Sequence, residues 1–242
     1  MQLKNLMKIL GVIPSRYEST RFPGKPLADI LGKSMIERVY QQCLKCSALD
    51  DIIVATDDKR IYDHVLTFGG KSVMTSKTHQ TGTERCNEVA KKLEEYKIII
   101  NIQGDEPFIN PLQIEEIITL FNNSEVQIGT LAKKIDDIKI LSDRNTPKAI
   151  FDKEQNAINF CRKIAKISNE DIYYKHIGIY AYRKNILEEI CRLPQSQNEI
   201  QEQLEQLRWL DNNYKIKVGI THFDSLSIDT ANDIEKIEQE IS

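Results

Sequence analysis

The sequence predicts an α/β fold in which a mostly parallel, Rossmann-like sheet is flanked by helices. Apolar runs of strand length alternate with amphipathic stretches of helical spacing through the first half of the chain. The strand-like runs are also continuous and rich in β-branched residues, as expected of strands that helices cover on both faces. In such sheets, ligands bind beyond the carboxyl ends of the strands.

The elements of the first half follow in regular order. Each expected strand is a short apolar run, at residues 7–13, 51–57, 71–75 and 97–103. Each expected helix has apolar residues at helical spacing, at residues 34–45, 59–68, 83–96 and 111–122. Gly69-Gly70 is a natural stop for the second helix, and Pro111 suits the first turn of the fourth.

The second half is less regular. We expect strands at residues 126–133, 149–151, 173–182 and 216–221, and helices at 198–210 and after Asp229. No linker rich in Pro, Gly or Ser divides the chain, and no internal repeat is visible. The sequence therefore predicts one domain over residues 1–242, with a smaller portion around residues 130–215.

Composition narrows the functional classes. The chain has 242 residues, 40% of them apolar, which is enough for a sizeable core. Its formal charge of −3 argues against a nucleic-acid binder, which normally carries a basic stripe. No apolar run reaches the roughly 18 residues of a membrane span, and no secretory leader is visible. We expect no membrane span, and either Met1 or Met7 as the start.

Cysteine usage predicts the compartment. The five cysteines include Cys43 and Cys46, but no second ligand pair lies at zinc spacing. Both fall in the expected helix 34–45, so core or helix-face thiols are favoured over a metal or redox site. Free thiols are typical of a reducing compartment, and we expect the protein to be cytoplasmic.

A cationic loop follows the first strand. Residues 14–26 contain three prolines and a glycine together with Arg16, Arg21 and Lys25. These cations can form charge-assisted hydrogen bonds to phosphate oxygens, while glycine permits close approach of the backbone. An ordinary charged surface loop is the alternative, but it would not need the prolines and cations together. The loop therefore predicts a triphosphate site.

Two distant carboxylates are candidate ligands of Mg²⁺. Asp105 follows Gln103 and Gly104 at the end of the isoleucine-rich strand, and Asp229 precedes the last helix. Mg²⁺ is usually held by one or two protein carboxylates with phosphate oxygens and water. The alternative is that both residues cap helices, and this alternative is more serious for Asp229.

Other polar residues give weaker indications. Arg85 lies just inside the helix that Thr81 or Thr83 caps, at the edge of the same crevice. His176 and Tyr180 share one face of a strand, where a core role is also common. Glu205 and Gln206 are adjacent in a polar helix. The alternative is that they lie on its solvated face. At most one of them faces the core squarely.

Several motifs together resemble the CMP-KDO synthetase family, the 3-deoxy-manno-octulosonate cytidylyltransferases. The resemblance covers essentially the whole chain from Met7. It is carried, in the family's order, by the loop 14–27, ATD at 55–57, TSKTHQTGTER at 75–85, NIQGDEP at 101–107, HIGIYAYR at 176–183, LEQLR at 204–208 and IDT at 228–230.

The resemblance implies a nucleotide-diphosphosugar transferase fold, a homodimer, and transfer of CMP from CTP to 3-deoxy-manno-octulosonate (KDO) for lipopolysaccharide biosynthesis. It implies that the CTP phosphates contact Arg16, Arg21 and Lys25, and that Gln103 contacts the nucleotide. It makes Asp105 and Asp229 the Mg²⁺ ligands. The remaining residues would line the sugar-acid pocket: Arg85, His176, Tyr180, Glu205 and Gln206.

Related functions stay open at this point. Glu84 and Glu106 favour KDO over its 8-amino form, and a sialic-acid type of substrate is a further alternative. Residues 159–166 keep only Phe160 and Arg162 of the family's usual segment, and the gap to His176 is short. A nucleotide-binding protein that has lost catalysis is therefore the alternative from another class.

Overall fold

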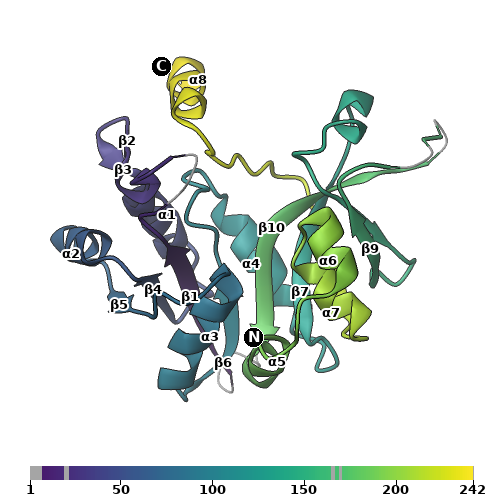
Figure 1. Cartoon of the computed structure of the whole chain (residues 1–242), viewed down its shortest axis with the longest axis horizontal. Coiled ribbons are helices and arrows are strands. Elements are labelled where there is room, and N and C mark those ends of the chain that lie inside the picture. Colours follow the sequence, from purple (N-terminus) through teal and green to yellow (C-terminus); the bar gives the residue numbers. More distant parts are fainter. Residues whose placement is uncertain (1–6, 19–21, 165–166, 169–170, 242) are drawn as a thin grey trace. The chain divides into compact units, whose positions relative to one another are not determined.

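The computed structural model describes residues 7–18, 22–164, 167–168 and 171–241, arranged in two compact units (Figure 1). Unit 1 contains the chain up to Glu115 and again from Asp224, and unit 2 contains Glu116–Phe223. Unit 2 includes all of the portion around residues 130–215 that the sequence sets apart. The expectation of a single domain stays a prediction.

Unit 1 is built on four parallel strands in the order β6-β1-β4-β5. They are β1 (Lys8–Ser15), β4 (Asp51–Thr56), β5 (Ser72–Met74) and β6 (Tyr96–Asn101). Strand β1 lies in the middle and pairs with both β4 and β6, so its side chains are buried on both faces. This arrangement confirms the mostly parallel α/β fold.

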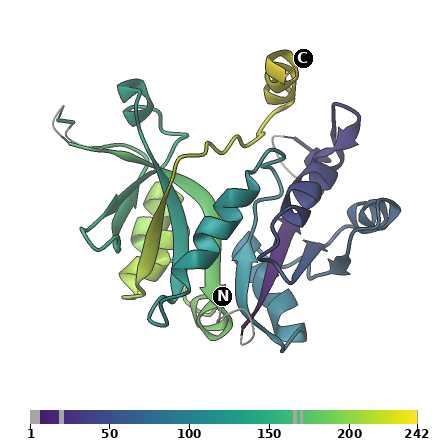
Figure 2. The same cartoon turned by 180° about the vertical axis from the view of Figure 1, so that it is seen from behind.

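The helices of unit 1 are α1 (Met35–Leu44), α2 (Lys59–Thr67) and α3 (Gly82–Lys92). The chain passes from β1 to β4 and β5 through α1 and α2, and then returns to β6 through α3. Because crossovers between parallel strands are right-handed, this reversal places α1 and α2 on one face of the strands and α3 on the other. Figures 1 and 2 show α3 in front of the strands in one view and α1 in front of them in the other.

Short elements complete unit 1. The 3₁₀ turn η1 (Lys25–Leu27) ends the cationic loop, and β2 (Asp29–Ile30) pairs with β3 (Lys33–Ser34) in a small hairpin. Helix α4 (Pro111–Leu120) runs across the boundary between the units. Helix α8 (Ala231–Ile241) closes the chain, and its Ile234 packs on a buried cluster of Ile30, Met35 and Ile228.

Unit 2 has a mixed sheet. Strand β7 (Ile128–Lys134) lies between antiparallel β10 (Tyr174–Arg183) and parallel β11 (Ile216–Thr221). The hairpin of β8 (Lys148–Phe151) and β9 (Ala157–Cys161) pairs with the start of β10. The helical elements are η2 (Ile138–Leu141), α5 (Lys184–Ile190), α6 (Gln197–Glu202) and α7 (Gln206–Asp211).

The structure corrects two predicted boundaries. The helix expected over residues 198–210 is broken into α6 and α7, because Gln203 adopts the left-handed region at φ 54° and ends α6 there. The helix expected over residues 83–96 ends at Lys92, and Tyr96 already opens β6. Strand β9 and helix α5 were not predicted.

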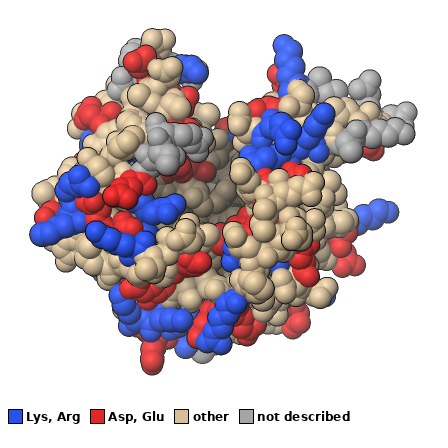
Figure 3. Space-filling model, in the orientation of Figure 1, with Lys and Arg blue, Asp and Glu red and all other residues tan. Residues whose placement is uncertain are grey.

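The surface and the thiols agree with the composition. Over much of the face drawn in Figure 3, Lys and Arg side chains lie among Asp and Glu side chains, in keeping with a formal charge of −3. Cys43 and Cys46 are buried free thiols, as expected of core positions. In the described part of the chain, no helix combines the length and the apolar character needed to span a membrane.

Candidate functional site

A cavity of about 470 Å³ lies in unit 1, where the carboxyl ends of β1 and β6 meet the start of α3. This is the edge at which the sequence predicts ligand binding. The cavity is lined by residues from three of the predicted loops: Pro14, Ser15, Arg16, Glu18, Lys25, Pro26, Thr81, Gly82, Arg85, Gln103, Gly104 and Asp105.

Contacts with Tyr17 shape the cationic loop. Gly24 donates its backbone N–H to the Tyr17 carbonyl at 2.9 Å and adopts φ 74°, which glycine tolerates best. The guanidinium of Arg60 lies 3.3 Å from the centroid of the Tyr17 ring, a cation–π contact. The closed loop places both Arg16 and Lys25 on the cavity wall. Arg21 lies outside the described residues.

The turn after β6 comes very close to the end of β1. A Cβ atom at Gly104 would lie 2.8 Å from the Pro14 carbonyl oxygen, so only glycine fits between the two segments. This contact places Gln103 and Asp105 on either side of the glycine in the cavity wall. The glycine that the sequence places beside Asp105 is therefore required by close packing.

Asp105 and Asp229 both lie close to the ammonium of Lys25. The Lys25 ammonium donates to Asp105 Oδ2 at 2.7 Å and lies 3.8 Å from Asp229 Oδ1. It also donates to the Ile228 carbonyl at 2.9 Å, and the Ile228 N–H donates to the Asp105 carbonyl at 2.9 Å. The two carboxylates that the sequence pairs across more than half of the chain thus lie together.

The contacts before α8 test the alternative that Asp229 only caps this helix. Asp233 Oδ2 accepts hydrogen bonds from the backbone N–H groups of Asp229 and Thr230 and from the Thr230 hydroxyl. Partial burial raises the pKa of the Asp233 carboxyl, but these hydrogen bonds outweigh it and the pKa is lowered. Asp233 therefore satisfies the backbone N–H groups of the two residues just before α8, while the Asp229 carboxylate lies beside Lys25.

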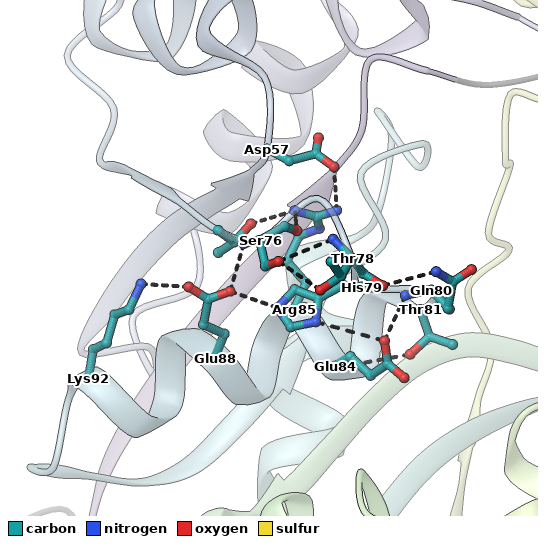
Figure 4. Close-up of polar contacts among 11 residues, drawn as sticks. Asp57, Ser76, Thr78, His79, Gln80, Thr81, Glu84, Arg85, Glu88 and Lys92 are labelled. Atoms are coloured by element: carbon teal, nitrogen blue, oxygen red, sulfur yellow. Dashed lines mark hydrogen bonds and ion pairs between the residues drawn. The ribbon is translucent and has the colours of Figure 1, made fainter. Parts of the chain in front are cut away.

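Arg85 is at the cavity but deeply buried, with 1% of its side chain exposed. Its guanidinium donates to Asp57 Oδ2 at 2.9 Å, to the Thr75 hydroxyl and to the Ser76 carbonyl (Figure 4). The ATD motif at the end of β4 thus supplies the partner of Arg85. These bonds hold the ends of β4 and β5 against α3, and the predicted contact of Arg85 with a sugar acid stays a prediction.

A second set of contacts in Figure 4 shapes the start of α3. The Thr81 hydroxyl accepts from the Glu84 N–H, which confirms Thr81 as the cap, and the Glu84 carboxylate accepts from the N–H of the preceding residue, Gln80. One turn later, Glu88 accepts from His79, Lys92 and the Ser76 N–H. Burial raises the pKa of Glu88, but these donors outweigh it and lower the pKa to about 2.

The remaining candidates cluster within unit 2. The His176 and Tyr180 rings lie 5.4 Å apart between centroids, and Tyr180 packs edge-on against Trp209. Burial, with the nearby charge of Glu205, raises the pKa of Tyr180 well above its ordinary value. Gln206 is buried in α7, and its Nε2 atom is a buried donor with no hydrogen-bond partner in the described structure.

His176 is a neutral, buried group. Burial lowers its pKa to about 3. Its Nε2 lies 2.9 Å from the Thr130 hydroxyl, which is also 2.9 Å from the Ile179 carbonyl. The hydroxyl has a single proton to donate to a carbonyl, so it accepts from Nε2–H of the imidazole. The interpretation of His176 as a satisfied core residue therefore agrees with the structure, and its contact with a sugar acid stays a prediction.

Sequence reasoning missed several polar partners. The ATD motif contains Asp57, but nothing in the sequence marks it as the carboxylate bound to Arg85. The sequence also does not predict that Arg162 donates to the carbonyls of Glu202, Gln203 and Arg144 and so fastens the end of β9 to the turn between α6 and α7. No sequence pattern marks these bonds, because they join residues distant in the chain.

Comparisons with known proteins agree on one family. A model of the cytidylyltransferase family matches residues 10–216. The chain is 51% identical to the 3-deoxy-manno-octulosonate cytidylyltransferase of Parabacteroides distasonis, over 96% of this chain and 97% of the relative. It is 45% identical to the 8-amino-3,8-dideoxy-manno-octulosonate cytidylyltransferase of Shewanella frigidimarina, over 96% and 98%. A solved CMP:2-keto-3-deoxy-manno-octonic acid synthetase with CTP superposes with a TM-score of 0.92 at 38% identity, covering 97% and 98%.

Proposed function

The chain belongs to the cytidylyltransferase family, and we propose that it transfers CMP from CTP to the anomeric hydroxyl of KDO, releasing pyrophosphate. The observation that carries this proposal is the convergence of Asp105 and Asp229 on one cation at the wall of a cationic cavity. The full-length likeness to KDO cytidylyltransferases supports KDO as the acceptor.

The chain's own residues supply most of what this reaction needs. The KDO hydroxyl attacks the α-phosphorus and pyrophosphate leaves, so negative charge grows on the phosphate oxygens. We propose that Arg16 and Lys25 hold those oxygens and that Gln103 contacts the nucleoside, and the position of all three residues in the cavity wall supports this. Catalysis is then positioning and electrostatic stabilisation, without a covalent nucleophile.

We propose that Asp105 and Asp229 hold Mg²⁺ when the nucleotide is bound. Two carboxylates with phosphate oxygens and water form a donor set of the kind that Mg²⁺ accepts. Their present contact with an ammonium shows that this position accommodates a cation. When bound, the ion would neutralise charge on the phosphates and orient them.

For the sugar acid, we propose contacts from His176, Tyr180, Glu205 and Gln206, and from Arg85. The buried Gln206 Nε2 atom, a donor without a partner in the described structure, supports a polar ligand there.

A substrate panel tests this function. Pyrophosphate release is followed with CTP, UTP, ATP and GTP, each offered KDO, 8-amino-KDO or a sialic acid, with and without Mg²⁺. We expect release only with CTP, KDO and the metal together. Faster release with 8-amino-KDO would transfer the assignment to the type of enzyme found in Shewanella frigidimarina. CTP binding in calorimetry with no product from any acid would favour a non-catalytic nucleotide-binding protein.

We further propose a cytoplasmic homodimer that serves lipopolysaccharide assembly. The resemblance to the family supports the homodimer and the role in lipopolysaccharide assembly, and the free thiols support the compartment. Exposed apolar side chains of unit 2 also support an interface there, among them Ile158 on β9, which is 62% exposed. Light scattering coupled to size exclusion should give twice the mass of the chain, and Ile158→Lys should shift it toward the monomer. A monomeric wild-type protein would refute the dimer.

A further inference from the structure

Protein oxygens surround the Lys25 ammonium, although a lysine that only binds phosphate would not need them. The side chain is 15% exposed, and its ammonium donates to Asp105 Oδ2 and to the Ile228 carbonyl, while Asp229 Oδ1 lies 3.8 Å away. The ammonium therefore neutralises part of the charge of the two carboxylates, at the position proposed for the metal.

We propose that Lys25 is the resident counter-cation of Asp105 and Asp229, and that nucleotide phosphates draw its ammonium away as a divalent ion takes its place. This inference rests on the proposed function, because it assumes that a nucleoside triphosphate enters the cavity. It adds a role that phosphate binding by Lys25 does not include: control over when the metal binds.

Repulsion between the two cations explains why the metal ion would replace the ammonium. A divalent ion and an ammonium on the same two carboxylates repel each other, so the ion alone must expel Lys25. The expelled ammonium would lose its main acceptors in a partly buried position, which is costly. Phosphate oxygens replace those acceptors. Metal and nucleotide therefore each raise the affinity of the other, and this coupling is reciprocal.

The geometry allows the exchange without a change of fold. Lys25 lies on the same cavity wall as Arg16 and Gln103. Its ammonium sits on a flexible four-carbon stem, so it can turn from the carboxylates to a phosphate. The backbone around it is held independently by the Gly24 N–H to Tyr17 carbonyl bond and the Leu27 N–H to Gly24 carbonyl bond.

A purely structural role for Lys25 makes the opposite prediction. Lys25 also bonds the Ile228 carbonyl, so it could act only as a tie that holds residues 228–229 in place. In that case, removing the ammonium would loosen Asp229 and weaken metal binding. The two roles therefore differ in the sign of one measurable effect.

The test measures Mn²⁺ binding without nucleotide, by the electron paramagnetic resonance signal of the free ion. Lys25→Met and Lys25→Gln should bind Mn²⁺ roughly tenfold more tightly than the wild type. Lys25→Arg keeps the charge and should bind as weakly as the wild type. Lys33→Met, which removes an exposed lysine near Glu37, is the matched control and should change nothing. Adding Asp105→Asn to Lys25→Met should abolish the gain.

Each outcome decides the proposal. Folded Lys25→Met and Lys25→Gln proteins that bind Mn²⁺ no better than the wild type would overturn it. Should both variants unfold, the wild type decides: Mn²⁺ alone should leave its thermal midpoint unchanged, and a rise equal to that with Mn²⁺ and CTP together would overturn the proposal. A wild type that does not bind CTP in calorimetry would instead refute the proposed function, whatever the metal does.

Discussion

The Glu199 carboxylate accepts two hydrogen bonds from the Arg208 guanidinium, at 2.7 and 2.5 Å, across the break between α6 and α7. Both side chains are buried, at 7% and 5% exposed. Glu199 also completes a capping box with Ser196 at the start of α6. One carboxylate thus fixes the start of α6 and the orientation of α7, which carries Gln206.

Removing one partner of this pair should destabilise the protein strongly. Arg208→Met leaves the Glu199 charge buried without its bidentate partner, and we expect a loss of about 3–5 kcal/mol in the free energy of unfolding in urea. Arg192→Met breaks an exposed pair with Glu188 and should cost about 0–1 kcal/mol. Equal losses in the two variants would show that the buried pair is not a main anchor of α7.

The pKa of His176 predicts a loss of stability in mild acid. The folded pKa, about 3, lies below the ordinary value of 6.5, so the unfolded chain binds the extra proton first. The stabilisation is complete above pH 6.5 and is lost as the pH falls from 6.5 toward 3, by at most about 5 kcal/mol.

Urea unfolding from pH 7 to pH 5 checks this prediction. His176→Gln should remove most of the decline over this range, because it has no proton to gain. The lowered pKa of Glu88 does not interfere, since its contribution is lost only as the pH falls from 4.5 toward 2. A decline of unchanged size in His176→Gln would contradict burial of the neutral imidazole.

Arg85→Lys separates the two roles of Arg85. Lysine keeps the charge but cannot hold Asp57 and Thr75 together as the planar guanidinium does. We expect a lower unfolding midpoint, and a larger rise in KM for KDO than for CTP. Equal rises in the two KM values would refute a sugar-side role and leave Arg85 as the anchor of Asp57.

Asp105→Asn should abolish turnover while leaving folding nearly intact. The change removes a charge at the cavity but keeps the side-chain volume, and the Asp105 carbonyl can still accept from the Ile228 N–H. Circular dichroism and thermal unfolding check the fold, and pyrophosphate release checks the activity. Asp63→Asn, which alters an exposed carboxylate on α2, should match the wild type in both. Unchanged turnover in Asp105→Asn would remove this residue from the proposed metal site.

The parts of the fold that the sequence predicted are those set by local patterns. Apolar runs and helical spacing located β1, β4, β6, α1 and α2 to within two residues, and Thr81 was correctly placed as a possible cap. The break at Gln203 escaped prediction, because glutamine carries no preference for the left-handed region that it adopts there. The Glu199–Arg208 pair joins α6 to α7 across this break, and such a tertiary contact leaves no local pattern in the sequence.

In the candidate site, too, sequence patterns predict some features and tertiary packing determines the others. The rule that ligands bind at the carboxyl ends of parallel strands predicts that Arg16, Gln103 and Asp105 lie at one site, and all three line the same cavity. The contact of Lys25 with both carboxylates could not be predicted, because it depends on the path of residues 224–230 back to β6. The burial of Arg85 against Asp57 was likewise a matter of packing.

The most direct test of the account follows the product itself. CTP and KDO are incubated with the wild-type protein and Mg²⁺, and mass spectrometry measures CMP-KDO while an enzymatic assay measures pyrophosphate. We predict that the two products form in equal amounts, and only when both substrates and the metal are present. Calorimetric binding of CTP without any CMP-KDO, at high protein concentration, would contradict the account.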